Sequence, residues 1–550
     1  MKQADSKGKW QTAEELDSQG IESSDGREGP LDIVVMGGSF SGASTAILLK
    51  RWLPWARILI VESSQEFDSK VGEATVELSA LFLTRALDCW DHLCREHMPK
   101  HGLRFWTTDG QQRSLAEMTE LGPSALPDIP SFQLDRAKFD EMLLQRAVDA
   151  GCELLRPARV IDVVTATSLG QETKLALEVD GTERLVRARW VVDATGRHGL
   201  LSKKLGLREK LASHPTTAYW ARWDGVKDLD SSEMVDVNGV DPTRLPPVAC
   251  SRRLGTNHFL GEGWWTWVIP LSGGQTSIGL VHNEKLVDLP GSGSLRPRFE
   301  EYVRRVDGLR DLLKDAELDA DDFRTYRHLP YCASQYMGPG WALVGDAAAF
   351  LDPFYSPGLD HCAYSVYATA RIIQEALSHD STEGELAETI ERHNTAFKLS
   401  YERQYEALYR NKYEIFGDPE LLAAAYDIDT AMYFLGVLRP AFDDLEELRF
   451  PPLGRPIWQA TLAFRTLRFF HRRLVFHARL RKKHGIYGRR AVGSRLLSFK
   501  FELGAFKLRA ILRGLRRWIG VEFSGLPLYL RGVKKPKVES SSVDTRPVQG

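Results

Sequence analysis

The stretch from Asp32 to Glu62 constrains the fold of this 550-residue chain more than any other segment. An apolar run at residues 32–36 leads into a turn that contains glycine, and small residues then open an apolar helical face. A second apolar run, at residues 58–61, ends on Glu62, twenty positions after Gly42. This order of strand, turn, helix and strand predicts a dinucleotide-binding unit.

Each glycine of the turn has a steric reason. Gly37 allows the tight turn, and Gly42 lets the helix lie close to the sheet. The pyrophosphate is expected at the positive end of the helix, and Glu62 is expected to accept a hydrogen bond from the ribose. Ser39 stands where the pattern usually has a further glycine. The residues predicted to bind the nucleotide here are Gly37, Gly38, Ser39, Ser41, Gly42 and Glu62.

The bulk composition is that of a globular protein. With 43% hydrophobic and 27% charged residues, the chain is long enough for two or three domains. The six cysteines form no C-x-x-C pair and no cluster of zinc-binding spacing, so we expect reduced thiols and no metal site. The N-terminus is polar, and no apolar run approaches eighteen residues. We therefore expect a cytoplasmic protein without a membrane span.

The order of segments predicts an α/β protein in which the nucleotide-binding, Rossmann-like domain is discontinuous. Helices are expected over Val76 to about Glu96 and, with Asp135 as a cap, over 137–150. The predicted parts are 1–29, a disordered segment; 30–210 and 325–375, the nucleotide-binding domain; 211–324, an inserted antiparallel β-sheet domain that binds substrate; 376–535, a helical region that is basic after 451; and 536–550, a disordered tail.

Three motifs in series carry a family resemblance. The segments Gly37–Gly42 with Glu62, Asp193–Gly196 and Gly345-Asp346 occur in that order. Across about residues 30–375 the chain resembles flavin monooxygenases of the para-hydroxybenzoate hydroxylase type. The resemblance implies FAD, with Asp346 at the ribityl chain and the next helix directed at the isoalloxazine. A carboxylate beside hydroxyls and a helix dipole near a ring that becomes anionic are both favourable.

A six-residue run separates this chain from ordinary hydroxylases. In the segment 265–270, Trp265, Trp267 and Ile269 face one side of a strand, and Pro270 ends the pairing. Such aromatics also suit a plain sheet core. The run is nevertheless similar to the W-x-W-x-I-P signature of flavin-dependent halogenases. That resemblance implies that the tryptophans keep the organic substrate away from the flavin and admit halide.

Lys100 is the candidate catalytic residue. Alone it would be a surface lysine after a helix, but Gly72-Glu73-Ala74-Thr75 resembles the G-E-A-T/S-x segment of the halogenases, and Lys100 lies 27 residues past Glu73. The resemblance implies that its ammonium hydrogen-bonds hypochlorous acid, or that its neutral amine forms a chloramine. The further residues implied to contact the flavin are Glu73, Ala74, Arg136, Gly345, Asp346, Pro353 and Gly358.

The segment Asp352–Gly358 departs from the halogenase pattern at two positions. The resemblance implies that halide binds to backbone N–H groups at positions 357 and 358. Pro357 has no N–H, so Gly358 and its neighbours must supply the donors. Tyr355 stands where tryptophan halogenases have a glutamate that stabilises the charged ring intermediate. This favours a ring that activates itself, such as a phenol or resorcinol.

The resemblance therefore implies a flavin-dependent halogenase. Reduced FAD from a separate reductase, O₂ and chloride or bromide would give hypohalous acid, which reaches Lys100 past Trp265 and Trp267. The substrate would be a small aromatic, free or tethered to a carrier protein. The alternatives are an FAD-dependent hydroxylase or oxidoreductase of the same fold without halide use, and a non-catalytic protein that keeps FAD for stability.

The charge is uneven along the chain. From Pro451 to Gly550 there are about 23 Lys and Arg against about 4 Asp and Glu, although the net charge of the whole chain is −2. Between Arg465 and Arg517 these cations border apolar stripes at helical spacing. One interpretation is a helix packed on the acidic remainder of the protein. The other is docking to an anionic membrane or an acidic carrier protein; nucleic acid is not expected, since no fold that binds it accompanies the charge.

Overall fold

Strand β1 (Leu31–Met36) is the centre of a largely parallel sheet in the computed structural model. It pairs in parallel with β2 (Ile58–Val61) on one side and β10 (Thr182–Asp193) on the other. The β1 side chains other than Asp32 are buried, as expected for a strand covered on both faces. The structure describes residues 11–18, 29–107, 114–231, 250–289, 291–378, 382–489, 495–499 and 506–530.

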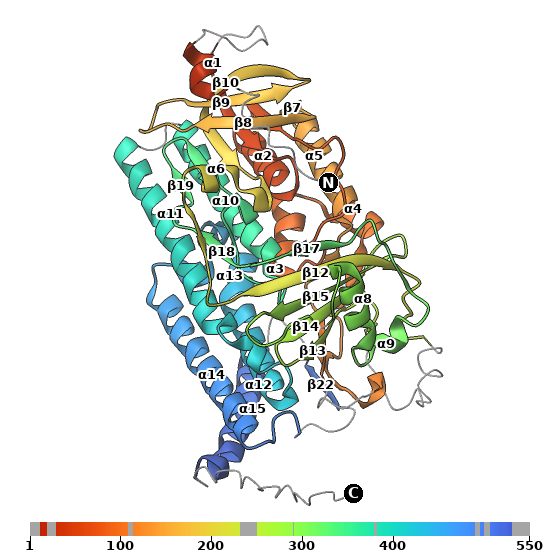
Figure 1. The fold of residues 1–550 in the computed structure, drawn as a ribbon. Coiled ribbons are helices and arrows are strands. Elements are labelled where there is room, and N and C mark those ends of the chain that lie inside the picture. Colours follow the sequence, from red (N-terminus) through yellow and green to blue (C-terminus); the bar gives the residue numbers. More distant parts are fainter. Residues whose placement is uncertain are drawn as a thin grey trace, which may run out of the picture.

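Three helices and five further strands complete this part of the structure. Helix α2 (Phe40–Trp52) packs on β1 and β2, and α5 (Arg136–Asp149) and α10 (Gly358–Leu377) pack against α2. The remaining strands of the sheet are β19 (Met337–Gly338), β20 (Trp341–Leu343), β7 (Glu153–Leu155), β8 (Ala158–Val164) and β9 (Thr173–Val179). Strands β7 to β10 of this sheet lie at the top of Figure 1.

The second sheet is nine-stranded and mostly antiparallel, and it extends beyond the predicted range of 211–324. Strands β4 and β5 come from the preceding segment, and β22 comes from the C-terminal region. Strand β4 pairs with β13, β5 pairs with β4 and β22 pairs with β5, so the edge of β13 is covered. The strands are β16 (Glu317–Leu318), β17 (Arg324–Tyr326), β12 (Thr216–Asp224), β15 (Thr276–Asn283), β14 (Trp264–Pro270), β13 (Thr256–Gly261), β4 (Leu103–Thr107), β5 (Thr119–Pro123) and β22 (Arg495–Phe499). Helices α8 (Leu295–Arg305) and α9 (Leu309–Leu312) follow β15 along the chain.

The prediction of disorder for residues 1–29 is wrong for one short helix, α1 (Ala13–Ser18). Ala13 and Leu16 are fully buried against strands β9 and β10. Asp17 pairs with Lys174 at 2.6 Å and with Arg187 at 2.7 Å. These contacts hold the segment on the sheet. The tail predicted at 536–550 lies outside the described residues.

The helix predicted from Val76 to Glu96 is interrupted. It consists of α3 (Glu77–Leu81), a π-helical turn η1 (Phe82–Ala86) and α4 (Trp90–Glu96). Asp88 lies between η1 and α4, and its left-handed backbone, with φ 56°, interrupts the helix there. Asp135 does not cap α5, because its carboxylate instead accepts a hydrogen bond from Arg222 at 3.1 Å.

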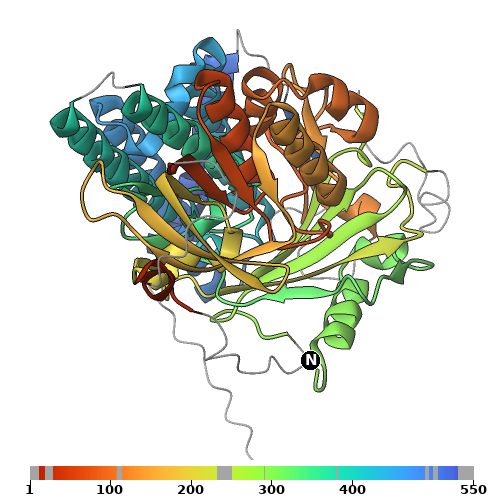
Figure 2. The same cartoon turned by 90° about the horizontal axis from the view of Figure 1, so that it is seen from above.

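The C-terminal region is helical as predicted, apart from β22, and it forms one side of the molecule (Figures 1 and 2). The antiparallel sheet, with α8 on its far side, lies opposite (Figure 2). The helical elements are α11 (Glu383–Gln404), η6 (Tyr405–Tyr409), α12 (Pro419–Tyr433), η8 (Phe434–Leu438), α13 (Arg439–Asp443), η10 (Pro452–Gly454), α14 (Trp458–Lys483) and α15 (Phe506–Leu530).

A buried ion pair joins two of these helices. Arg481 of α14 donates to both carboxylate oxygens of Asp418, at 2.7 and 2.9 Å, and Asp418 caps α12 by accepting from Leu421 N–H. One stretch, Pro419–Asp443, has the length and mean hydropathy, 1.4, of a membrane-crossing helix. Within this stretch, 56% of the 18-residue segment with that mean hydropathy is buried inside the protein. The stretch therefore also fits a core helix.

Candidate active site

The turn between β1 and α2 has no room for a side chain at either end. Gly37 has φ +98°, and a Cβ there would lie 2.7 Å from the Ala194 carbonyl oxygen. A Cβ on Gly42 would lie 1.8 Å from the Gly37 carbonyl oxygen. The first turn of α2 therefore packs directly on the backbone that precedes it.

Glu62 closes this turn from the end of β2. Its buried carboxylate accepts from Gly38 N–H at 2.7 Å and from Ser64 N–H at 2.8 Å. Each oxygen keeps a further lone pair for a ribose hydroxyl. On the other side of the turn, a Cβ on Gly345 would lie 2.4 Å from the Ser41 hydroxyl, so Ser41 and Gly345 lie against each other.

Arg136 supports the backbone behind the site. Its guanidinium donates twice to Asp140, at 3.1 Å each, and to the carbonyl oxygen of Gly72 at 3.3 Å. Asp140 also accepts from the Ser39 hydroxyl at 2.9 Å. Arg136 and Ser39 thus join α5 to the nucleotide turn and to the segment that carries Glu73.

A cavity of about 110 Å³, which we call the sheet cavity, lies beside strands β12, β13 and β14 of the antiparallel sheet. It brings together five of the predicted flavin-contacting residues and the three side chains of the W-x-W-x-I-P run that face one way. These are Glu73, Ala74, Asp346, Pro353, Gly358, Trp265, Trp267 and Ile269.

The carboxylate of Asp346 can accept hydrogen bonds from a bound ligand. Within the described residues, its carboxylate accepts no hydrogen bond from a protein donor, although Arg197 lines the same cavity. Burial raises the pKa of Asp346 to about 6, and Arg197, Arg136 and Arg208 oppose that rise. Burial likewise raises the pKa of Glu73 to about 7. A ribityl chain rich in hydroxyls would supply the donors that Asp346 lacks.

The two tryptophans are fixed by hydrogen bonds. Trp265 is 1% exposed, and its indole N–H donates to the Tyr413 hydroxyl at 2.9 Å. Tyr413 donates in turn to Asp352 at 2.9 Å, and Asp352 pairs with His214 at 2.8 Å. Trp267 donates to the Ser277 hydroxyl at 3.2 Å.

The segment Asp352–Gly358 separates two cavities. Ser356 and Gly358 line the sheet cavity, whereas Tyr355 and Pro357 line a second, larger one. Tyr355 (φ 72°) and Ser356 (φ 57°) are both left-handed, which non-glycine residues rarely are. Such backbone strain is retained where the surroundings impose it and is frequent at functional sites.

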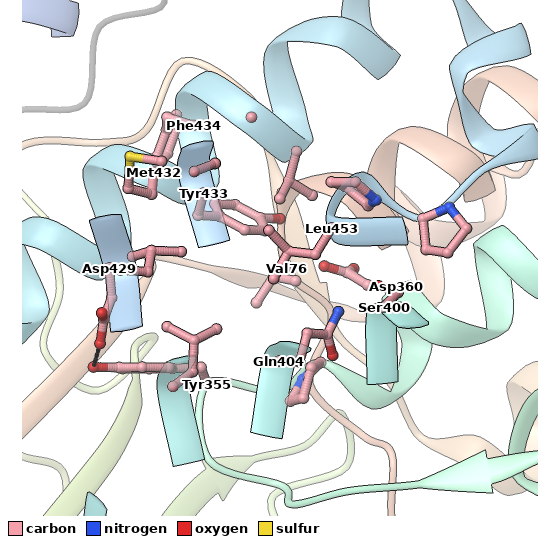
Figure 3. Close-up of a pocket in the computed structure, with 18 of the residues that line it drawn as sticks. Val76, Tyr355, Asp360, Ser400, Gln404, Asp429, Met432, Tyr433, Phe434 and Leu453 are labelled. Carbon is pink, nitrogen blue, oxygen red and sulfur yellow. Dashed lines mark hydrogen bonds between the residues drawn. The ribbon is translucent and has the colours of Figure 1, made fainter. Parts of the chain in front are cut away.

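We call the larger space, of about 460 Å³, the helix cavity. It lies among α10, α11, α12, η8, η10 and α14 (Figure 3). Its lining is mostly apolar and aromatic, and its acidic and basic groups include Lys100, Glu77 and Asp360. In Figure 3, Asp360 and Ser400 lie on one side of the space, and Met432, Tyr433 and Phe434 lie across it.

Lys100, at the end of β3 (Met98–Lys100), is buried rather than at the surface. Its ammonium donates to the Thr75 carbonyl oxygen at 2.5 Å, and the residue is 2% exposed. Burial lowers the pKa of Lys100 to about 8, while the charges of Glu77 and Asp360 hold it from falling further. Burial also raises the pKa of Asp360 to about 7 and that of Glu77 above its ordinary value. Perturbed groups of this kind concentrate at functional sites.

Tyr355 is tied down on the other side of the helix cavity. Its hydroxyl donates to Asp429 of α12 at 3.0 Å, as Figure 3 shows, and Lys412 also pairs with Asp429. Burial raises the pKa of Tyr355 far above its ordinary value, so the phenol stays neutral. The side chain is therefore a fixed part of the wall.

Several residues at this site were missed by sequence reasoning. Glu77 and Asp360 each lie within four residues of a quoted motif, and their acidic side chains next to it were a usable signal. Tyr413, Asp429 and His214 have no such signal, because they reach the site only through tertiary packing.

Comparison with known proteins assigns the chain to a family. The family model described as tryptophan halogenase matches residues 32–124 and 115–411. The chain therefore belongs to the tryptophan halogenase family.

Individual relatives agree with that assignment. Flavin-dependent halogenase chlA of Dictyostelium discoideum is 28% identical over 381 residues, which are 63% of this chain and 60% of the relative. Tetracycline 7-halogenase of Kitasatospora aureofaciens is 27% identical over 64% of each chain. The chain thus spans less than two thirds of these relatives. A carrier-protein-dependent relative, the 1H-pyrrole-2-carbonyl-[peptidyl-carrier protein] chlorinase of Pseudomonas fluorescens, is 25% identical over 75% of this chain and 85% of its own.

Solved structures show the same fold. The crystal structure of halogenase PltM matches with a TM-score of 0.66 and 19% identity over 90% of this chain and 97% of that one. PltM in complex with phloroglucinol and FAD matches over 89% and 96% at the same TM-score. The expectation of a Rossmann-like α/β domain with an added sheet and a C-terminal helical region is confirmed.

A single methyl group in the nucleotide turn should remove bound FAD. We expect Gly42→Ala to displace α2 from Gly37, since the added Cβ would lie 1.8 Å from a backbone oxygen, at a cost of about 1–3 kcal/mol or more. Flavin absorbance of the purified protein measures the loss. The matched control is Gly384→Ala, in the first turn of α11, where a Cβ meets nothing within 4 Å. Equal FAD content in the two variants would show that this turn does not hold the cofactor.

Proposed function

We propose that this protein is a flavin-dependent halogenase that uses halide and reduced FAD to halogenate a phenol-like aromatic. One observation carries the proposal: a row of packed aromatic rings, which we call the wall, lies between the cavity lined by predicted flavin-contacting residues and the cavity that holds Lys100. Ring centroids along this wall lie 5.4 Å apart for His258 and Trp265, 5.4 Å for Trp265 and Phe354, and 4.3 Å for Phe354 and Tyr355. A substrate in the helix cavity is thereby kept from the flavin.

The sheet cavity is the proposed site of the isoalloxazine. Asp346 would accept from the ribityl hydroxyls, and the turn at Gly37, Gly38 and Gly42 would hold the pyrophosphate with Glu62 at the ribose. The N-terminus of α10 borders the same cavity at Gly358, where its dipole favours negative charge. Reduced FAD, bound here with O₂ and halide, supplies hypohalous acid.

Halide is proposed to bind at the start of α10. Pro357 has no N–H, and its carbonyl oxygen accepts from His361 N–H at 3.0 Å. Gly358 has open space where a Cβ would be and lines the sheet cavity. Its N–H and that of Leu359 belong to the first helical turn, whose donors have no partner within the helix. These two donors replace the one that Pro357 lacks.

Lys100 is the proposed catalytic residue of the helix cavity. With a pKa of about 8, its amine is protonated in about nine tenths of molecules at pH 7. The ammonium donates a hydrogen bond to hypohalous acid and makes the halogen more electrophilic. The halogen replaces a hydrogen of the ring, and the released proton joins the hydroxide of the acid to form water.

The wall also favours an electron-rich substrate. Tyr355 occupies the position of the stabilising glutamate, and its hydroxyl is committed to Asp429. A phenol or resorcinol needs no such carboxylate, because its own oxygen carries the charge of the ring intermediate. Family membership favours this reading over a hydroxylase of the same fold. A separate flavin reductase is the proposed source of reduced FAD, and a carrier-tethered substrate and a cytoplasmic location remain predictions.

Replacing Lys100 should separate the two halves of the reaction. We expect Lys100→Met to lower halogenated product by at least about 100-fold while oxidation of reduced FAD by O₂ continues, because the lysine acts after the flavin. Mass spectrometry of product and oxygen uptake provide the measurements. Lys138→Met, at an exposed lysine of α5, is the control. Undiminished product from the Lys100 variant would remove this residue from the mechanism.

The pH profile should report the charge of Lys100. Because the protonated form is the proposed catalyst, the halogenation rate should fall as pH rises through about 8. Asp360 raises the pKa of Lys100, so Asp360→Asn should move that fall to lower pH, whereas Asp443→Asn on the surface should not. A rate that instead rises through pH 8 would indicate the neutral amine, and hence the chloramine route.

The basic C-terminal region divides into two parts. Many of its cations pair with carboxylates elsewhere, as the packing interpretation predicts; they include Arg455, Arg479, Arg481, Lys482, Arg513 and Arg517. Others are exposed and have no carboxylate partner within the described residues; these are Arg465, Arg472, Lys483, Arg489 and Arg516. The second group leaves charge available for a partner.

Exposed apolar side chains accompany the second group of cations. On α14 they recur at Trp458, Leu462, Phe469 and Phe476, and on α15 at Leu512, Ile519, Phe523 and Leu526. The rings of Phe476 and Tyr529 lie 6.5 Å apart, so the two stripes adjoin. We call this the α14–α15 face. Aromatic and aliphatic side chains bordered by arginine are typical of helices at a membrane surface. Docking to an anionic membrane is therefore proposed for this face.

Vesicle sedimentation tests that docking. Each exposed cation contributes about 1 kcal/mol near an anionic bilayer, so the protein should sediment with anionic vesicles at low salt and be released near roughly 0.5 M salt. Phe523→Ser, 71% exposed in the wild type, should weaken binding, while Trp55→Ser, 56% exposed but distant in sequence, should not. No sedimentation, or binding to an acidic carrier protein alone, would contradict the membrane proposal.

A further inference from the structure

The helix cavity is larger than one aromatic ring requires. An apolar cavity of roughly 150 Å³ holds benzene, and the helix cavity has about 460 Å³. Side chains of η8, η10 and α14 line a large share of this space, which we call the far part of the cavity. They include Leu435, Gly436, Val437, Leu453, Ala460 and Ala463.

The polar groups of the cavity are suited to a ring with hydroxyls. Besides Lys100, the cavity is lined by His361 and Tyr364, both on α10. Asp360 of the same helix also lines the cavity and lies near enough to Lys100 to raise the pKa of that lysine, and its carboxylate can accept from a ring hydroxyl. Burial lowers the pKa of His361 to about 4, so its ring is neutral at pH 7.

The far part of the cavity reaches the surface at the start of α14. Ile457 lines the cavity and is 46% exposed. The neighbouring Trp458 is 70% exposed and Leu462 is 53% exposed, and both belong to the α14–α15 face. An apolar path therefore leads from that face to the polar groups.

Resting on the proposed halogenase function, we propose that the substrate is a phenol or resorcinol with a long hydrocarbon substituent. The ring lies beside Lys100 and Asp360, which line the same cavity, and a ring hydroxyl donates to the Asp360 carboxylate. The hydrocarbon chain runs along η8 and η10 and leaves past Ile457. A phosphopantetheine arm fits this path poorly, because its amides would lie unpaired among Leu, Val, Pro and Ala side chains.

A chain-length series tests the inference. We would compare 5-methyl-, 5-pentyl- and 5-undecylresorcinol with the holoenzyme, reduced FAD and bromide. Each methylene that enters the cavity should lower KM by roughly threefold to fourfold, the ratio that corresponds to about 0.8 kcal/mol. The kcat/KM for pentyl should exceed that for methyl by at least about 30-fold, mostly through KM.

A filled cavity supplies the matched comparison. Gly436→Phe places a ring in the far part, where a Cβ on Gly436 meets nothing within 4 Å. It should lower kcat/KM for the pentyl substrate by at least about tenfold more than kcat/KM for the methyl substrate, because only the longer chain needs the filled space. Gly384→Phe, at an exposed position in the first turn of α11, should change neither value of kcat/KM. If Gly436→Phe does not fold, Ala463→Phe takes its place, and the wild-type series decides independently.

The outcomes separate this inference from the function on which it rests. Calorimetric binding of the same resorcinols, without reduced flavin, should tighten with chain length. Tight, length-dependent binding without halogenation would overturn the halogenase proposal and keep the apolar site. Halogenation with equal kcat/KM for methyl and pentyl, or use of a carrier-bound phenol alone, would overturn the long-chain substrate and keep the function.

Discussion

Asp352 is the group on which the wall between the two cavities depends. Its buried carboxylate accepts from Phe354 N–H at 2.9 Å, from Tyr413 at 2.9 Å and from His214 at 2.8 Å. These bonds hold two consecutive left-handed residues, Tyr355 and Ser356, in a conformation that the chain alone would not keep. Because Tyr413 also fixes Trp265, one carboxylate sets both the turn and the aromatic wall.

On the far side of that wall, low polarity gives Lys100 its character. The negative charges of Glu77 and Asp360 raise the pKa of the Lys100 ammonium. The loss of hydration on burial lowers that pKa by more, so the pKa falls to about 8. The C-terminal helices α12 and α14 form walls of the helix cavity that Lys100 lines. In the proposed mechanism those helices therefore enclose the site of the reaction.

The sequence predicted those parts of the protein that are local. The run 32–62 specifies its own strand, turn and helix, and the alternation at Trp265, Trp267 and Ile269 places all three in one cavity. The sequence did not predict the reach of the second sheet, because β22 joins β5 across hundreds of residues. It also gave no sign of the Asp429 partner of Tyr355 or of the cavity size, which depend on how distant helices pack. Lys100 was found through motif spacing, but its burial was not.

The central claim is that the oxidant crosses the wall as hypohalous acid and the flavin itself never meets the substrate. Reaction under ¹⁸O₂ with bromide and a resorcinol tests it most directly, with mass spectrometry of the ring product. The account predicts a brominated ring that contains no ¹⁸O, because the labelled oxygen leaves as water. Incorporation of ¹⁸O into the ring would show direct oxygen transfer from the flavin and would contradict a wall built by Trp265, Phe354 and Tyr355.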